Sequence, residues 1–328
     1  MITLLTLLAC QPTKDAVDPP HTGDSTAVTP SGMDSRYLMA FFACEGATCE
    51  TPGVAVHYTW VAASNDGWTW EMPEGYTPFE GSVPDLVRRD DTLYVYAATT
   101  TLRRYHYDSG EWEEPITPVV YGEDGEPHRW ADPAPLLGDD GLIHMFFFDT
   151  TGEIPDPAEC HEELAPCIKH FGSAIEIPGS DGAEFQMQPG YRAEVPLEVG
   201  QRCADPDVFR TAEGDWVMTI LYQEQTLGYR SDTLHGTYTP IPTLTDGFIT
   251  DPYFNLMSSL WDEREGHYTS FATCPRFIDG VVYIDIARAD HARVDETITG
   301  FEPSLGPGDP PELPEGWWAV SPGFILNE

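Results

Sequence analysis

Apolar and polar residues follow a unit that repeats along the chain: two short apolar runs joined by an acidic turn. One copy, RWADPAPLLGDDGLIHMFFF, covers residues 129–148, and RCADPDVFRTAEGDWVMTI at 202–220 repeats it with Pro133 aligned on Pro206. Short apolar runs on either side of a polar, glycine-containing turn predict β-hairpins. Because such a unit buries its apolar face only against its neighbours, the repeat predicts the architecture.

Two more copies extend the series. GSVPDLVRRDDTLYVYA at 81–97 aligns Pro84 with Pro133, and the weaker LMSSLWDEREGHYTSFA at 256–272 places Met257 where two other copies have Asp before Pro. Further strand-like segments with polar turns lie between the copies: VHYTWVAASNDGWTWEM, LRRYHYDSGEWEEP and QTLGYRSDTLHGTYTPI. Four strands per unit, repeated at intervals of roughly 45–75 residues, are typical of propeller blades.

The two ends of the chain complete one further blade. The N-terminal strand YLMAFFA has no proline-containing strand before it, whereas WAVSPGFIL at 318–326 brings Pro322 into the same column as the other prolines. Joining both ends in one blade removes an open sheet edge. We therefore predict an all-β, five-bladed β-propeller over residues 33–328, with the first blade shared between 33–75 and 317–328. A β-sandwich is the alternative, but it leaves the repeat and the matching C-terminal strand unexplained.

The first residues, MITLLTLLAC, resemble the lipobox of bacterial lipoproteins, in which the cysteine is acylated. The resemblance implies a signal peptide at residues 1–9, a lipid on Cys10 and export to the bacterial cell envelope. By the same resemblance, Gln11 after the cysteine implies the outer membrane. Residues 10–32 are rich in Pro, Thr, Ser and Asp, which predicts a flexible tether. A stray apolar N-terminus is the alternative, because no Lys or Arg precedes the apolar run as a signal peptide requires.

The charge balance restricts the partners. The 328 residues include 55 Asp and Glu against 16 Lys and Arg, which gives a formal net charge of −39. This excess disfavours nucleic acid, since phosphate binding needs clustered bases. It also disfavours an anionic membrane surface, so we expect membrane contact only through the lipid. We expect the protein to be a monomer.

Seven cysteines fit an exported protein. If the lipid uses Cys10, six remain, an even number that suits disulfides in an oxidising compartment. The expected pairs are Cys44 with Cys49, Cys160 with Cys167, and Cys203 with Cys274 across neighbouring blades, although other pairings stay open. A zinc site is the alternative for Cys160, His161, Cys167 and His170, but their spacing matches no common zinc finger.

The innermost strands of a propeller surround a central channel, and their first residues meet at one mouth. The residues before each repeated proline should therefore point near the axis: Val83, Asp132, Asp205, Met257 and Ser321. Asp85 and Asp207 follow the proline, and strand alternation should turn them away from the axis itself, with Asp85 still beside the mouth. Two aspartates at equivalent places suggest a site.

The motifs SVPDLV, ADPAPLL and ADPDVF, with SNDGWTW between strands, resemble the five-bladed glycosidases of the arabinanase and β-xylosidase type and their relatives that cut fructans. Those enzymes use a carboxylate base, a carboxylate acid and a third Asp that orients the acid. The resemblance implies that Asp132 is the orienting residue and that Asp205 stands where the family has its acid, normally Glu. The base position holds Ser321, so Glu194 or Asp34 would have to replace the base. Inverting hydrolysis needs two carboxyls about 6.5–9.5 Å apart.

The resulting hypothesis is a surface-anchored, glycosidase-like propeller that hydrolyses or binds neutral furanose- or xylose-type glycans at the channel mouth. We expect no cofactor, and an axial calcium ion stays open. The residues expected to contact the glycan are Trp130, His128, Asp85, His57 and Ser321. The alternative is a non-catalytic propeller lipoprotein that binds a glycan or a protein at the same mouth.

Each of these residues also has a structural interpretation. An Asp before Pro can accept backbone hydrogen bonds at a strand entry, and aromatic side chains can pack between blades. SNDGWTW resembles the Asp-box turn of sialidases, but it lacks a residue of that pattern and the chain has few, scattered arginines. We interpret it as a turn on the outer rim.

Overall fold

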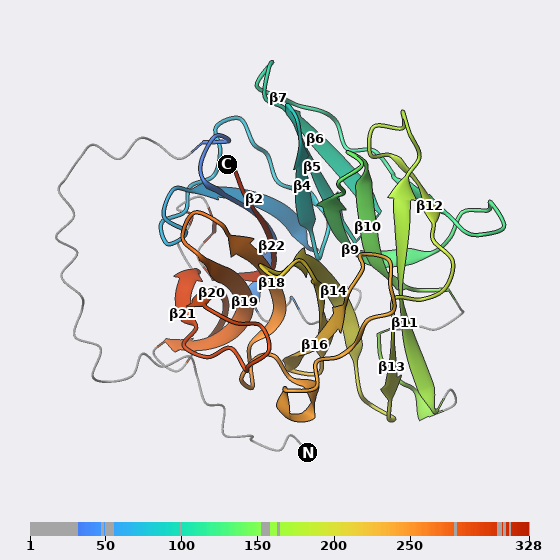
Figure 1. The fold of residues 1–328 in the computed structure, drawn as a ribbon. Coiled ribbons are helices and arrows are strands. Elements are labelled where there is room, and N and C mark those ends of the chain that lie inside the picture. The colour runs from blue at the N-terminus through green and yellow to red at the C-terminus, as the bar shows by residue number, and fades with distance from the viewer. Residues whose placement is uncertain are drawn as a thin grey trace.

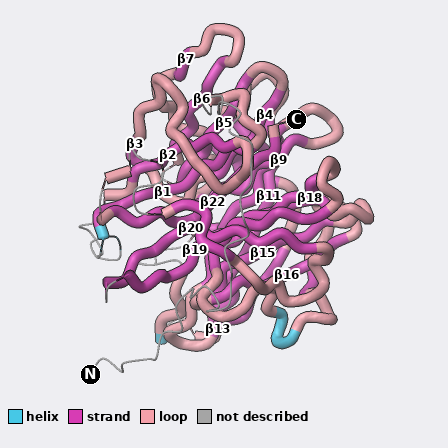
Figure 2. Tube along the Cα trace, turned by 90° about the vertical axis from the view of Figure 1, so that its left-hand side faces the viewer, coloured by secondary structure: helices cyan, strands magenta, loops and turns pink. Residues whose placement is uncertain are grey.

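The computed structural model describes residues 32–46, 49, 56–98, 100–151, 158–162, 165–278, 281–306, 310, 313–314 and 316–327. Within these residues the strands form five sheets arranged as the blades of a β-propeller (Figure 1), which confirms the predicted fold class. Almost everything else is loop, with helix confined to short segments such as η3 at Thr245–Gly247 (Figure 2). In the described part of the chain, no helix is long and apolar enough to cross a membrane. Residues 1–31, with the predicted signal peptide, Cys10 and nearly all of the tether, lie outside it.

Four blades are four-stranded sheets, each with its strands in order from the axis outward. The first blade consists of β22 (Trp317–Leu326), β1 (Tyr37–Glu45), β2 (Tyr58–Ser64) and β3 (Phe79–Glu80). The second consists of β4 (Asp85–Arg89), β5 (Thr92–Ala97), β6 (Thr101–His106) and β7 (Glu111–Trp112). The fourth consists of β14 (Cys203–Arg210), β15 (Trp216–Tyr222), β16 (Gln225–Ser231) and β17 (Thr239–Pro240). The fifth consists of β18 (Asn255–Asp262), β19 (His267–Ile278), β20 (Val281–His291) and β21 (Glu302–Leu305).

The third blade is larger than the repeat predicts. It consists of β9 (Trp130–Leu137), β10 (Ile143–Asp149), β11 (Cys167–Glu176), β12 (Glu184–Met187), β8 (Val119–Tyr121) and β13 (Ala193–Leu197). The long β11 pairs with β13 along its first half and with β12 along its second half. Strand β8 then adds to β12 in parallel, from the segment that enters the blade. The repeat did not reveal these two extra strands, because they have no counterpart in the other blades.

The first blade closes the ring as predicted. Strand β1 pairs antiparallel with β22 from Tyr37 opposite Leu326 to Glu45 opposite Trp317. The innermost strands contact one another in the order β22, β4, β9, β14, β18 and back to β22. The SNDGWTW segment is the turn after β2, in which Asp66 Oδ1 accepts the N–H groups of the two residues that follow Gly67. Its predicted role as a turn is confirmed.

In the described part of the chain, the core is divided into five main hydrophobic clusters, one between each pair of neighbouring blades. Between the fifth and first blades, the buried Phe271 contacts Trp70 and Phe324 edge-on, with ring centroids 5.7 and 4.8 Å apart. The Trp70 indole N–H also donates to Ser304 Oγ at 3.0 Å, so its polar group is satisfied. Edge-to-face pairs of this kind add stability beyond the buried area itself. The blades therefore hold one another in place around the axis.

A ring of five residues in the left-handed backbone region marks the start of the innermost strands. We call it the channel ring: Val83 (φ 44°), Asp132 (φ 53°), Asp205 (φ 48°), Leu256 (φ 50°) and Ser321 (φ 56°). In four of the blades the inner strand carries one extra residue here relative to its partner, which is a β-bulge. For residues with a Cβ atom this conformation costs about 1–2 kcal/mol each. Such strain persists where the surrounding fold imposes it, often at functional sites.

The channel ring corrects the alignment of the fifth blade. The left-handed residue there is Leu256, so Leu256 and not Met257 corresponds to Asp205. Met257 takes the place of the proline, and Ser258 takes that of Asp207. The sequence pattern failed at this position because the fifth blade has neither Asp nor Pro to fix the register.

Candidate functional site

The channel behind the ring is too narrow for a sugar. Residues before, at and after the repeated proline line a cavity of about 20 Å³ on the axis, including Val83, Asp85, Asp205, Asp207 and Ser321. A space of this size holds about one water molecule. A glycan must therefore bind at the mouth of the channel and not inside it.

Asp132 and Asp205 come from neighbouring blades and meet at the ring, as predicted. The Asp205 N–H donates to Asp132 Oδ2 at 3.4 Å. Asp205 Oδ1 is enclosed, and no donor among the described residues reaches it. Burial first, and the charge of Asp132 second, raise the pKa of Asp205 well above its ordinary value, against a smaller opposing effect of Arg202. Burial and the neighbouring carboxyl group therefore both favour the protonated form of Asp205.

A second pair of carboxyl groups lies one step deeper, and this corrects a prediction. Asp85 and Asp207 line the channel instead of turning away from it. The left-handed residue two positions earlier breaks the strand alternation on which the prediction depended. Burial and the charge of Asp207 raise the pKa of Asp85, although Asp85 Oδ1 accepts the Leu86 N–H at 2.7 Å. Burial also raises the pKa of Asp207 to about 6, against the Ser259 N–H that donates to Asp207 Oδ2 at 3.1 Å.

The rest of the ring carries no acid. Val83 and Leu256 pack against an apolar cluster that includes Phe42 and Trp318. Ser321 is buried, and its N–H donates to Thr273 Oγ1 at 2.9 Å. The ring is therefore acidic on the side of the third and fourth blades and apolar or neutral on the other three.

The two residues considered as replacements for the base lie elsewhere. Glu194 is on β13 at the outer part of the third blade, where its side chain is 60% exposed and Oε1 lies 3.2 Å from His170 Nδ1. Asp34 is exposed and lies near Tyr105 and Tyr107, whose pKa values burial and the Asp34 charge both raise. The structure brings neither carboxylate to Asp132 and Asp205.

The side chains expected to contact the glycan have different surroundings. Trp130 is 5% exposed and packs between the second and third blades, so its role is structural. His57 is half-buried and stacks on Phe42 with ring centroids 4.6 Å apart, beside the apolar half of the ring. His128 is held by Asp149, with Nε2 3.2 Å from Oδ1.

Asp149 was missed by the sequence reasoning. It ends β10 directly opposite Trp130, at the same mouth as the channel ring. Burial acts to raise the pKa of Asp149, but hydrogen bonds from His128 and Thr151 outweigh burial and lower that pKa to about 2. The Tyr191 hydroxyl donates to Asp149 Oδ2 at 3.0 Å. A polar residue directly after the buried run IHMFFF was the available signal.

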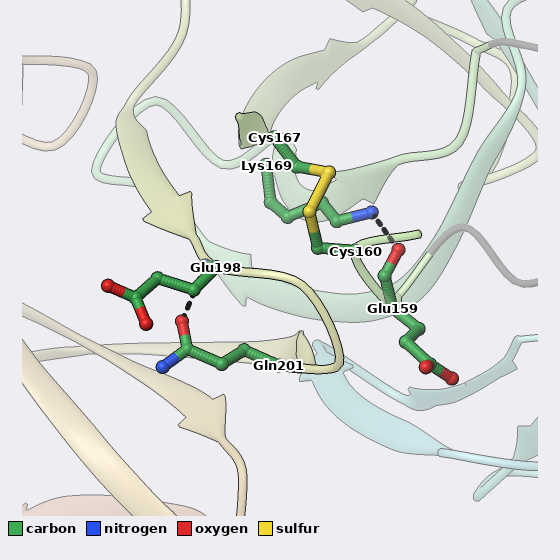
Figure 3. The surroundings of a disulfide bond; sticks show 6 residues. All are labelled: Glu159, Cys160, Cys167, Lys169, Glu198 and Gln201. Carbon is green, nitrogen blue, oxygen red and sulfur yellow. Dashed lines mark hydrogen bonds between the residues drawn. A yellow bond between two sulfur atoms is a disulfide. The ribbon is translucent and has the colours of Figure 1, made fainter. Parts of the chain in front are cut away.

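The two predicted short-range disulfides are confirmed: Cys44–Cys49 and Cys160–Cys167. Figure 3 shows the second one beside Lys169, whose ammonium donates to the Glu159 carbonyl at 2.8 Å. Because this disulfide uses both sulfurs, the zinc alternative at Cys160, His161, Cys167 and His170 is wrong. In the part of the chain that the structure describes, no group of three His, Cys, Asp or Glu side chains is placed to hold a metal ion.

The predicted bond between Cys203 and Cys274 is wrong. Both are buried thiols, and they belong to different hydrophobic clusters. Cys203 faces the third blade from the fourth, whereas Cys274 faces the fourth blade from the fifth. The two sulfurs are therefore on opposite sides of the fourth blade.

No family model and no curated protein matches the chain. Among solved structures, the chain is similar to fructan 1-exohydrolase IIa from Cichorium intybus, with a TM-score of 0.52 and 11% identity over 76% of this chain and 53% of that one. This likeness shows the fold alone. The chain spans about half of that enzyme's length.

Two other similar structures have lower TM-scores. For an endo-1,4-β-xylanase from Bacteroides thetaiotaomicron the TM-score is 0.47, with 12% identity over 83% of this chain and 96% of that one. For an arabinanase from Bacillus subtilis the TM-score is 0.44, with 11% identity over 68% of this chain and 76% of that one.

Proposed function

We propose that the protein is a glycosidase-like propeller that binds a neutral, furanose- or xylose-type glycan at the mouth formed by the channel ring. In this proposal Asp205 donates its proton to the glycosidic oxygen, and Asp132 orients Asp205 and raises its pKa. The supporting observation is the buried pair itself: a carboxyl group whose pKa is raised by burial and by a second carboxyl group beside it is the arrangement that general acid catalysis uses.

A second candidate function is glycan or protein binding without hydrolysis. Inverting hydrolysis needs a carboxylate base about 6.5–9.5 Å from the acid with a water between them. The ring offers Ser321 at the position of the base, and the next nearest acids on the axis, Asp85 and Asp207, lie inside a channel with room for about one water. The absence of a third carboxylate from the ring supports this candidate.

We also propose that the propeller is exported and held at the bacterial outer membrane by a lipid on Cys10. Two disulfides support an oxidising compartment. The lipobox-like MITLLTLLAC sequence supports the anchor.

The experiment compares glycan binding and aryl-glycoside hydrolysis by the full chain and its variants. If Asp205 is the acid, Asp205→Asn and Asp132→Asn should each reduce hydrolysis about 100-fold or more. Asp139→Asn is the matched control, because Asp139 is 94% exposed on the hairpin turn of the third blade. If no glycan binds, or both ring variants act as the wild type does, the proposal is wrong.

A further variant separates the two candidate functions. Ser321→Asp places a carboxylate at the position of the base, on a left-handed residue where Asp is tolerated better than most residues. If the wild type binds a glycan without cleaving it and Ser321→Asp gains hydrolysis, the natural protein is the binding form. If the wild type already hydrolyses the glycan, another group supplies the base.

A further inference from the structure

The channel has a second opening that the proposed function does not use. At the far ends of the innermost strands, beyond the prolines, the protein has a cavity of about 680 Å³, which we call the far funnel. All five innermost strands contribute to its wall, together with residues that directly follow them: 85–88 and 90, 135–137, 207–208, 258, 260–261 and 263, and 324–327. The far funnel thus lies on the axis, on the face opposite the channel ring.

The wall of the far funnel, away from the narrow channel, is largely apolar. Its partly buried or exposed side chains include Leu136, Leu137, Leu260, Trp261, Ile325 and Leu326. Among these side chains, Leu137 is exposed, with a relative exposure of 42%. Apolar side chains left open to solvent around a concave site favour an apolar portion of a ligand.

The floor of the far funnel is acidic. Asp85 and Asp207 line both the funnel and the narrow channel behind it. Asp85 is 8% exposed, and its Oδ1 accepts the Leu86 N–H. Burial raises the pKa of both carboxyl groups, and the charge of Asp207 raises the pKa of Asp85 further, because like charges repel.

The charged groups around the far funnel do not neutralise this floor. Two more acids, Asp90 and Glu263, stand at the rim, and among the described residues Arg88 is the one basic residue of the lining. The Arg88 guanidinium lies over the Tyr107 ring at 4.0 Å and donates to the Asp90 carbonyl and to Asn327. It is therefore engaged away from the buried pair. A cation at the floor would remove the repulsion between the two carboxylates.

We propose that the far funnel binds a primary ammonium group carried on an alkyl chain. The ammonium lies between Asp85 and Asp207 and donates to both carboxyl groups, and the chain lies along the Leu260 and Trp261 side of the wall. A metal ion would need further ligands, and no group of three such side chains is placed for one in the described residues. Binding an ammonium favours the ionised pair, so the affinity should rise between pH 5 and pH 7.5 as Asp207 loses its proton.

The test is isothermal titration of the full chain with hexylammonium chloride at pH 7.5. We expect binding that weakens at least tenfold in the double variant Asp85→Asn, Asp207→Asn, and at least threefold at pH 5 in the wild type. Glu263→Gln removes a rim charge and should change the affinity less than twofold. Neutral 1-hexanol, which has the same chain, should bind at least tenfold more weakly than the amine.

Three results would overturn the proposal: no binding by the wild type, equal binding by the double variant, or equal binding of 1-hexanol. If the double variant does not fold, Asp85→Asn alone and the pH dependence decide the question. The ammonium group could belong to a free amine or to a lysine side chain of another protein. A parallel titration with a blocked lysine amide distinguishes these two sources, and tighter binding of either ligand supports the site. The outcome is independent of the glycan proposal, because the far funnel and the ring mouth lie at opposite ends of the channel.

Discussion

Removing the charge of Asp207 should stabilise the protein at neutral pH but not at pH 4. Burial raises the pKa of Asp207 from 3.8 to about 6. Between these values the folded state binds more protons than the unfolded state, so the free energy of unfolding falls as the pH rises from about 4 to about 6. At about 1.4 kcal/mol for each pH unit, the full loss is about 3 kcal/mol and is present above pH 7. Asn cannot ionise, so Asp207→Asn avoids this loss.

The assay is thermal unfolding of the wild type and Asp207→Asn at pH 4 and pH 7.5. With an unfolding entropy of about 2.1 cal/mol/K per residue, a domain of about 300 residues gains roughly 5 °C from 3 kcal/mol. At pH 4 both proteins should melt within about 2 °C of each other, because Asn keeps an oxygen that can accept the Ser259 N–H. The exposed Asp139→Asn variant measures the general effect of removing one charge from a chain of net charge −39. If Asp207→Asn is the less stable protein at pH 7.5, backbone donors hold the ionised form and the reasoning is wrong.

Three further predictions concern separate parts of the chain. Burial and nearby His144 lower the pKa of His235 to about 4. Acidification from pH 6.5 to pH 4 should therefore lower the free energy of unfolding of the wild type by about 1–2 kcal/mol after solvent screening. Urea unfolding of His235→Gln should lack this loss. The buried Cys203 and Cys274 should react with iodoacetamide only after unfolding, and labelling of the native protein would contradict their burial between the blades. Cys10→Ser should release the protein from the membrane fraction, and unchanged fractionation of the variant would rule out the lipid anchor.

The sequence was sufficient to predict the number of blades and how the ring closes. Hairpin units can be recognised because a buried inner strand and an acidic turn recur in the same order, and Pro322 aligns with the prolines of the other units. The extra strands β8 and β13 of the third blade were not predictable in this way. They pair with β12 and β11, and the other blades have no counterpart of either extra strand.

The candidate site was predicted in part. Asp132 and Asp205 meet because the repeat places them at equivalent ends of adjacent inner strands. The inward direction of Asp85 and Asp207 was missed because strand alternation assumes a regular backbone. In both strands a residue in the left-handed region lies two positions before the aspartate. A backbone of this kind is imposed by the neighbouring blades and leaves little trace in a sequence. The wrong pairing of Cys203 with Cys274 has a similar origin, because adjacency of blades does not say which face of a blade a side chain occupies.

The closure of the first blade also has a mechanical consequence. The Asn327 N–H donates to the Arg36 carbonyl at 2.7 Å, and its side-chain amide donates to the Met33 carbonyl at 2.9 Å, so both ends of the domain leave from one spot. A domain with adjacent ends can be inserted into a loop of a host protein or circularly permuted with little distortion. Tension between the same two ends would open the β1–β22 ladder one hydrogen bond at a time, as a zipper opens, because the strands run antiparallel from that spot. A force that acts on residue 32, without an opposing force at Asn327, would not pull these two strands apart.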